Sequence, residues 1–221
     1  MILAEKIIKF YTNLNTPSHL PENVEVMNPY QNGDSLEVAG AFYKKYYSDN
    51  NERTVLFGIN PGRFGGGVTG VPFTDPEKLE TYCGISNPFD KKQELSSKFI
   101  YDMIIAYGGP ELFYSKYYIS AISPLGFVKD GKNLNYYDIK EFKELITHYA
   151  LDTIKAQMAF PLSTKVAYCI GQGQNLKFLE LLNQEGNFFD EIITVPHPRW
   201  VMQYRLKRKA EFIREYLDKL D

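Results

Sequence analysis

Residues 54–73 read TVLFGINPGRFGGGVTGVPF, and this stretch decides how the rest of the chain can be arranged. Its first six residues are mostly apolar or β-branched, which is typical of a strand buried in a sheet. The apolar run stops at the turn-forming Asn60-Pro61-Gly62. The sequence therefore predicts a strand that delivers Asn60 to the beginning of a loop.

The loop after Asn60 carries five glycines between positions 62 and 70, and glycine lets a backbone approach a ligand closely. It is not a P-loop, because no Gly-Lys-Ser/Thr follows, and it lacks the GxGxxG spacing of dinucleotide-binding loops. Asn60 offers an amide that can hold a water or a substrate, and Phe73 offers an aromatic face for a base. The loop is a candidate ligand site, and a glycine-rich turn around a buried Phe73 is the alternative.

Three more strands are predicted, at residues 117–122, 165–170 and 191–195. The helical patterns cover residues 3–14, 35–47, 74–84, 96–107, 138–160 and 201–220, and a segment around Leu176, Leu179 and Leu182. This alternation predicts an α/β three-layer sandwich with a central four-stranded, mainly parallel sheet and helices on both faces. The carboxyl ends of such strands would gather Asn60, Ser123, Gly171 and His197 at one edge.

Composition limits the class of protein. With 221 residues, 44% of them hydrophobic, the chain is predicted to form one domain over residues 1–221. Cys83 and Cys169 lie far apart in apolar contexts, which indicates reduced thiols rather than a disulfide or a metal site, and no cofactor is predicted. The N-terminal pattern mixes charged with apolar residues, so we predict no signal peptide or membrane span and expect a cytoplasmic protein. A net charge of −2 means that binding of nucleic acid would need a local basic patch.

Residues 60–73, NPGRFGGGVTGVPF, resemble the first motif of the single-strand-selective monofunctional uracil-DNA glycosylases, whose pattern is close to GMNPGPFG followed by TGVPF. Shorter matches follow the family order along most of the chain. They are Asn28-Pro29, Gly108-Gly109-Pro110, Ser123-Pro124-Leu125, Gly131-Lys132-Asn133-Leu134, Gly171-Gln172-Gly173 and His197-Pro198. Together with the long first motif, they make the chain similar to the uracil-DNA glycosylase superfamily.

The resemblance implies an enzyme that flips a deaminated base, such as uracil, xanthine or hypoxanthine, out of DNA. The enzyme would hydrolyse the N-glycosidic bond and leave an abasic site for base excision repair. Phe73 would stack on the base, Asn60 would place the attacking water, and His197 would donate a hydrogen bond to the base oxygen that gains negative charge. Backbone amides around Gly62 would add donors. These roles require Asn60 and His197 to line one cleft with Phe73 as its floor.

Position 121 departs from the family pattern. The family ends its second strand with an asparagine that reads the Watson–Crick edge of uracil, whereas this chain has Ala121 in SAISPL. Ser120 or Ser123 could replace the missing amide, or the base preference could relax toward deaminated purines. We therefore expect modest uracil excision with relaxed preference among deaminated bases.

The predicted partner is single- or double-stranded DNA, bound by a monomer without membrane contact. HPRWV replaces the family's HPSPR, so Arg199 and Trp200 are candidates for the wedge that fills the gap left by a flipped base. Arg205, Lys207 and Arg208 on the last predicted helix are candidates for phosphate contacts. The alternative function is a non-catalytic binder of DNA or of a nucleotide on the same fold, which would need the pocket and the basic helix but not the catalytic pair.

Overall fold

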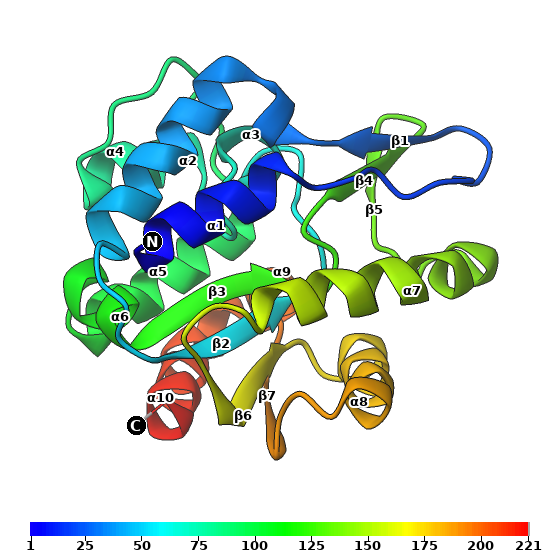
Figure 1. Ribbon diagram of the computed structural model, residues 1–221. Helices are drawn as coiled ribbons and strands as arrows, with labels where there is room; N and C mark the ends of the chain where they lie inside the picture. The colour runs from blue at the N-terminus through cyan, green and yellow to red at the C-terminus, as the bar shows by residue number, and fades with distance from the viewer. Residues whose placement is uncertain (221) are drawn as a thin grey trace.

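A computed structural model describes residues 1–220 and is built around a parallel sheet (Figure 1). The sheet order is β3-β2-β6-β7, formed by β3 (Tyr117–Ala121), β2 (Arg53–Gly58), β6 (Leu162–Ile170) and β7 (Glu191–Val195). All three strand pairings are parallel. The predicted four-stranded sheet is confirmed, and the carboxyl ends of its strands lie at one edge.

Helices cover both faces of this sheet, as the alternation of side chains along β3 shows. Tyr118 lies on one face, where its hydroxyl is 3.4 Å from Tyr11 and 3.3 Å from Gln157. Tyr117 lies on the other face and packs against Phe113, with ring centroids 5.0 Å apart. These contacts place α1 (Leu3–Thr12) and α7 (Lys140–Gln157) on the first face and α6 (Pro110–Lys116) on the second. The Tyr107 ring, 5.6 Å from that of Tyr117, places the end of α5 (Leu95–Tyr107) on the second face too. The predicted three-layer sandwich is confirmed.

Two helices of the C-terminal half take opposite faces of the sheet in the same way. Cys169 contacts Asn175 of α8 (Gln174–Gly186), which puts α8 on the face of α7. Its neighbour Tyr168 points the other way and donates a hydrogen bond to the carbonyl of Lys219 in α10 (Lys209–Lys219). Helices of the C-terminal half thus contribute to both outer layers of the sandwich.

A second, antiparallel sheet was not predicted. Its order is β1-β4-β5, with β1 (Val24–Met27), β4 (Gly126–Lys129) and β5 (Lys132–Leu134). The sequence analysis predicted no strand at residues 24–27 or between 126 and 134. The signal for the β4–β5 hairpin was Asp130-Gly131, since both residues have the positive φ values, 49° and 69°, that suit a two-residue hairpin turn. This hairpin carries Asn133 to the edge of the parallel sheet.

Helix beginnings follow side-chain caps. In α4 (Pro76–Cys83), Asp75 accepts a 2.9 Å hydrogen bond from the Lys78 N–H and so caps the helix predicted at residues 74–84. The helix predicted from residue 35 begins earlier, as α2 (Gly33–Tyr46), because Asn32 caps it by accepting a hydrogen bond from the Ser35 N–H at 3.1 Å. The short α3 (Gly66–Thr69) within the glycine-rich loop was not predicted.

The predicted helix over residues 201–220 is divided. It consists of α9 (Pro198–Tyr204), the 3-10 turn η2 (Leu206–Arg208) and α10. The buried Tyr216 hydroxyl of α10 donates to the carbonyl of Pro196. A continuous helix would hold these residues about 27–30 Å apart at 1.5 Å per residue, so burying Tyr216 against the sheet requires the break. No described helix is long and apolar enough to cross a bilayer.

Candidate active site

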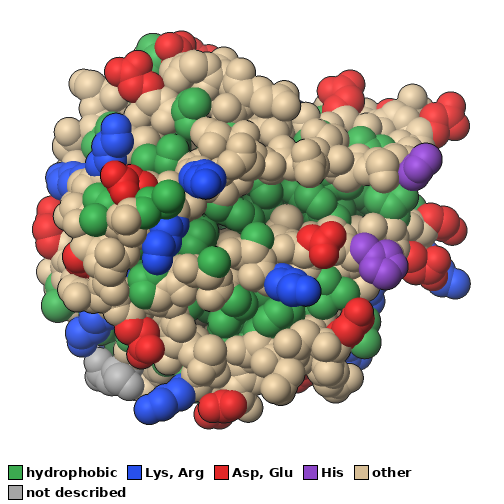
Figure 2. Space-filling view, in the orientation of Figure 1, with side chains coloured by type: hydrophobic (Ala, Val, Ile, Leu, Met, Phe, Trp, Pro, Cys, Tyr) green, Lys and Arg blue, Asp and Glu red, His purple; other side chains and the backbone are tan. Residues whose placement is uncertain are grey.

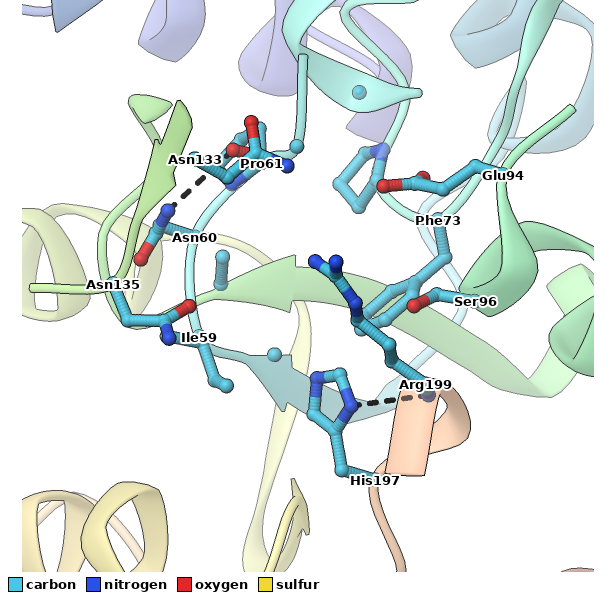
Figure 3. A pocket seen from close by; sticks show the side chains of 15 residues that line it. Ile59, Asn60, Pro61, Phe73, Glu94, Ser96, Asn133, Asn135, His197 and Arg199 are labelled. Carbon is cyan, nitrogen blue, oxygen red and sulfur yellow. Dashed lines mark hydrogen bonds between the residues drawn. The ribbon is translucent and has the colours of Figure 1, made fainter. Parts of the chain in front are cut away.

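A pocket opens at the carboxyl ends of β2 and β3, where the sequence analysis expected a ligand (Figure 3). Asn60, Phe73 and His197 all line it. Asn60 follows β2, Phe73 ends the glycine-rich loop, and His197 follows β7. Three segments that are far apart in the sequence therefore meet in one cleft, as predicted. Gly62 and Ala121 line the same pocket.

Phe73 is held at the end of β2 by its own unusual backbone conformation and by the absence of a side chain at Gly58. Its φ of +52° is a strained value for an aromatic residue. Its ring lies over Gly58, where a Cβ would come within 2.7 Å of Cε2 and 2.9 Å of Cζ. Glycine is therefore required in this strand because the Phe73 ring occupies the place of a side chain at position 58.

The resemblance implies that Phe73 stacks on a flipped base, so replacing Gly58 by alanine is expected to displace the Phe73 ring and to lower excision of that base. A misplacement of about 1 Å can cost about 100-fold in rate, so we expect a loss of up to that size. Single-turnover excision measures it. Gly33→Ala is the matched control, since no atom lies within 4 Å of a Cβ built there. Wild-type excision by a folded Gly58→Ala variant would contradict this role for the Phe73 ring.

The amide of Asn60 is fixed by the last residue of β5 and the segment after it. Its Nδ2 donates to the carbonyl of Leu134 at 3.1 Å, and its Oδ1 accepts from the Tyr136 N–H at 3.3 Å. These partners determine which way the amide faces, because a backbone carbonyl only accepts and an N–H only donates. Oδ1 keeps a second lone pair, which can hold a water in the pocket.

His197 is the cap of α9, and this fixes its tautomer. Its Nδ1 accepts a 3.2 Å hydrogen bond from the Arg199 N–H, so the ring proton of the neutral form is on Nε2. Burial, and then the positive charge of Arg199, lower the pKa of His197 to about 4. His197 is therefore neutral at pH 7 and can donate a hydrogen bond through Nε2.

Two predicted base-reading residues do not reach the pocket. The Ser120 hydroxyl donates to Gln157 Oε1 at 2.6 Å on the α7 face of the sheet, and the Ser123 hydroxyl donates to the Leu125 carbonyl at 2.9 Å. Both residues are fully buried. Successive strand residues point to opposite faces, so the placement of Ala121 in the pocket turns Ser120 away from it. Neither serine replaces the missing amide.

The predicted DNA-contacting residues separate into two groups. Arg199 lines the base pocket itself. Trp200 is 40% exposed, with Phe212 against its edge and the Arg205 guanidinium 4.9 Å from its ring centroid. Arg208 in η2 forms a 2.8 Å ion pair with Glu211, and Lys207 beside it is exposed. Arg199 therefore belongs to the pocket, and the other residues form a surface beside it.

Comparison with known proteins identifies the family. The model of the uracil DNA glycosylase superfamily matches residues 44–221. The chain belongs to this superfamily. It is also similar to SMUG2 of Pedobacter heparinus, a protein of known crystal structure. The two chains are 41% identical in sequence and superpose with a TM-score of 0.95, and the match covers 99% of this chain and 97% of that chain. The protein is thus a SMUG-like DNA glycosylase, a hydrolase of N-glycosyl bonds in base excision repair, and DNA is its substrate. The alternative of a non-catalytic binder is set aside.

The glycosylase pocket also contains polar residues that the sequence analysis missed, namely Glu94, Ser96, Asn133 and Asn135. Glu94 precedes α5 and carries the only carboxylate among the described residues lining this pocket. Burial, and then the negative charge of Asp75, raise its pKa to about 7, although Arg199 acts in the opposite direction. No sequence motif marked Glu94, because it lies in an irregular segment whose path to the pocket depends on the tertiary structure.

Metal binding is a separate question for this glycosylase. Among residues 1–220, no group of three or more His, Cys, Asp or Glu side chains is arranged to hold a metal ion. The two cysteines, Cys83 and Cys169, are buried and free.

Proposed function

We propose that this glycosylase removes deaminated bases, namely uracil, hypoxanthine and xanthine, and that a neutral His197 stabilises the departing base. The observation that carries the proposal is the Arg199 N–H bond to Nδ1 of His197, which leaves an Nε2–H donor in a pocket floored by Phe73. Deaminated bases share ring carbonyl groups that can accept this bond. The enzyme works as a single-domain monomer on DNA.

The departing base becomes an anion as the N-glycosidic bond breaks, while the sugar becomes cation-like. A donor aimed at the oxygen that gains negative charge lowers the barrier most when the site excludes water. Neutral imidazole is suited to this task. It keeps its N–H donor throughout the pH range near about 6.5 in which an ordinary histidine side chain gains or loses its charge. The low pKa of His197, about 4, supports this role.

Phe73 and Asn60 have complementary roles. Phe73 stacks on the flipped base, and the close contact of its ring with Gly58 holds this platform in place. Asn60 holds the attacking water on the free lone pair of Oδ1, while Leu134 and Tyr136 keep the amide in orientation. The N-glycosidic bond breaks with both of its electrons going to the base; the held water then adds to the cation-like sugar carbon, and the proton that the water loses neutralises the departed base anion.

Base preference among the three substrates is expected to be relaxed, because Ala121 offers no polar atom to the base edge. Oligonucleotides that each contain one uracil, hypoxanthine or xanthine test the function, with alkali cleaving the resulting abasic site. Strand cleavage at all three bases is the expected result. Absence of cleavage at every deaminated base, by a folded protein that binds the same DNA, would contradict the proposal.

The surface beside the pocket is proposed to hold DNA phosphates. Changing Arg205, Lys207 and Arg208 together to glutamine should weaken DNA binding and reduce the slope of log affinity against log salt. For single strands the reduction should be about 2, at about 0.7 per phosphate contact. Equilibrium binding over a salt series measures it.

A control for this phosphate surface lies on α1 and α7. Lys6, Lys9 and Lys155 belong to these helices, on the sheet face away from α5 and α10, and their replacement by glutamine should leave the slope unchanged. Figure 2 shows acidic and basic side chains interspersed on that face around a hydrophobic hollow, rather than a basic patch. Equal slopes for both triple variants would assign Arg205, Lys207 and Arg208 to ordinary surface.

A further inference from the structure

Glu94 is held at the pocket by its backbone, while its side chain has no partner. Its N–H donates to the buried Asp75 Oδ2 at 3.0 Å, and its carbonyl accepts from the Lys98 N–H at 2.9 Å. Among the described residues, no hydrogen bond or ion pair involves its carboxyl group. A carboxyl group that faces a pocket without a partner has its hydrogen-bonding capacity left for a ligand.

The glycine-rich loop makes room for this carboxyl group. A Cβ at Gly62 would collide with Oε1, and a Cβ at Gly65 would collide with Oε2. Both glycines have negative or extended φ values rather than left-handed ones, so close approach rather than backbone strain accounts for them. The carboxyl group therefore forms a wall of the pocket, and Figure 3 shows it on the opposite side of the Arg199 side chain from His197.

We infer that Glu94 binds the flipped base as a protonated carboxyl group, in place of the amide that Ala121 does not supply. This inference rests on the proposed function. The acid O–H donates to a ring carbonyl oxygen, and its C=O accepts from the adjacent ring N–H. A neutral carboxyl group thus presents the same donor and acceptor pair as a carboxamide. Uracil and hypoxanthine both carry the matching N–H and C=O pair.

The protonation state of Glu94 decides whether its side chain stabilises or repels the departing base. A carboxylate would repel the departing base anion, whereas a protonated acid donates a hydrogen bond to it, as neutral carboxylic acids do in other oxyanion sites. Asp75 faces Glu94 from the beginning of α4 and favours the protonated form. Lys78 lies 4.0 Å from Asp75 and offsets part of that charge.

The remaining charged neighbours lie on the open side of Glu94. Arg199 faces it from α9 and favours the ionised form, and neutral His197 lies beyond Arg199. Arg63 and Lys132 line the groove that Glu94 shares with the pocket. These three cations oppose protonation, while burial and Asp75 favour it.

Binding of the base strengthens the protonated state. The pocket encloses about 80 Å³, well below the roughly 300–1,000 Å³ of small-molecule sites, and Figure 3 shows Arg199 running into it between Phe73 and His197. A base stacked on Phe73 takes the space of this side chain. Its displacement removes a positive charge from the surroundings of Glu94, and the base itself excludes water, so both changes raise the fraction that is protonated.

The test is the pH dependence of single-turnover excision of uracil and hypoxanthine, between about pH 5.5 and 8.5. The protonated form is present below the pKa of about 7 and is lost above it, so the wild-type rate should fall as pH rises through about 7. Glu94→Gln keeps the donor and the acceptor without titrating. The excision rate of Glu94→Gln should therefore not decline as pH rises, and near about pH 8.5 it should be higher than the wild-type rate. Any ionisation of the substrate is common to both enzymes.

Glu94→Leu keeps a neutral side chain of similar size but has no donor or acceptor. It should excise both bases about 10- to 100-fold more slowly than Glu94→Gln, with its folding checked by thermal unfolding. Glu111→Gln removes an exposed carboxylate on α6 and should keep the wild-type profile. A Glu94→Gln variant with the wild-type pH decline, or a Glu94→Leu variant as fast as the wild type, would overturn the inference.

A binding measurement separates this inference from the proposed function. DNA containing 2′-fluoro-2′-deoxyuridine keeps its glycosidic bond, because fluorine disfavours the cation-like sugar. Wild-type affinity for it should fall as pH rises through about 7, and that of Glu94→Gln should not. If the wild type excises no deaminated base, the proposed function fails, and the binding data still decide the role of Glu94. Equal pH dependence of binding in the wild type and in Glu94→Gln would overturn the inference that a protonated Glu94 binds the base.

Discussion

Replacing His197 by asparagine is expected to lower single-turnover excision of uracil by about 100- to 1,000-fold, the loss seen when one oxyanion donor is removed. Asparagine is a good helix cap, so its side chain can still accept the Arg199 N–H bond that His197 accepts. It is too short to place a donor where Nε2 now lies. The variant should therefore fold and keep α9 while losing the donor to the base oxygen.

His148→Asn is the matched control for this change, because His148 is exposed on α7. It should excise uracil at the wild-type rate. Binding of DNA containing 2′-fluoro-2′-deoxyuridine by His197→Asn should stay within about tenfold of the wild type, since the donor matters most when negative charge develops. Excision by His197→Asn within about tenfold of the wild type would remove His197 from the catalytic role.

The pKa of His197 also has a consequence for stability. Its value is lowered from 6.5 to about 4 on folding, so the unfolded chain binds more protons between these pH values. The stability contributed by keeping His197 neutral is therefore complete above about pH 6.5 and is lost as pH falls toward 4. The wild type should lose more thermal stability over this window than His197→Asn does.

The catalytic edge could be predicted because its residues follow directly from strand ends. Asn60 and His197 each stop an apolar run, and parallel strands bring their carboxyl ends to one edge whatever the loops do. Phe73 was found by its motif rather than by any strand. The dependence of its ring on Gly58 is a contact between a strand and a loop, which no local pattern contains.

The placement of the two serines and of Glu94 could not be predicted from the sequence. Ser120 and Ala121 are neighbours, so only one of them can face the pocket, and the sequence did not specify which. Glu94 reaches the pocket because Asp75, at the beginning of another helix, holds its N–H. Such placements arise from contacts between segments that are distant in the chain. The break between α9 and α10 has the same origin in the buried Tyr216.

Replacing Asn60 by alanine is expected to lower excision by about 100- to 10,000-fold, the range for a positioned group that handles the attacking water. The same change removes the bonds to Leu134 and Tyr136, so the variant should also lose about 1–3 kcal/mol of stability. Thermal unfolding and single-turnover rates measure the two effects separately. Binding of DNA containing 2′-fluoro-2′-deoxyuridine should change little, because the amide contacts water rather than the base.

Asn60→Asp distinguishes the placement of water from the clamp on the segment after β5. A carboxylate can still accept the Tyr136 N–H bond and can hold a water, but it cannot donate to the Leu134 carbonyl. Repulsion between the carboxylate and the Leu134 carbonyl offsets the bond that is kept, so this variant should weaken the clamp about as much as alanine does, while keeping an oxygen for the water. If Asn60 places the water, Asn60→Asp should excise uracil at least tenfold faster than Asn60→Ala. Equal rates for two equally destabilised variants would show that Asn60 acts only by holding Leu134 and Tyr136 in place.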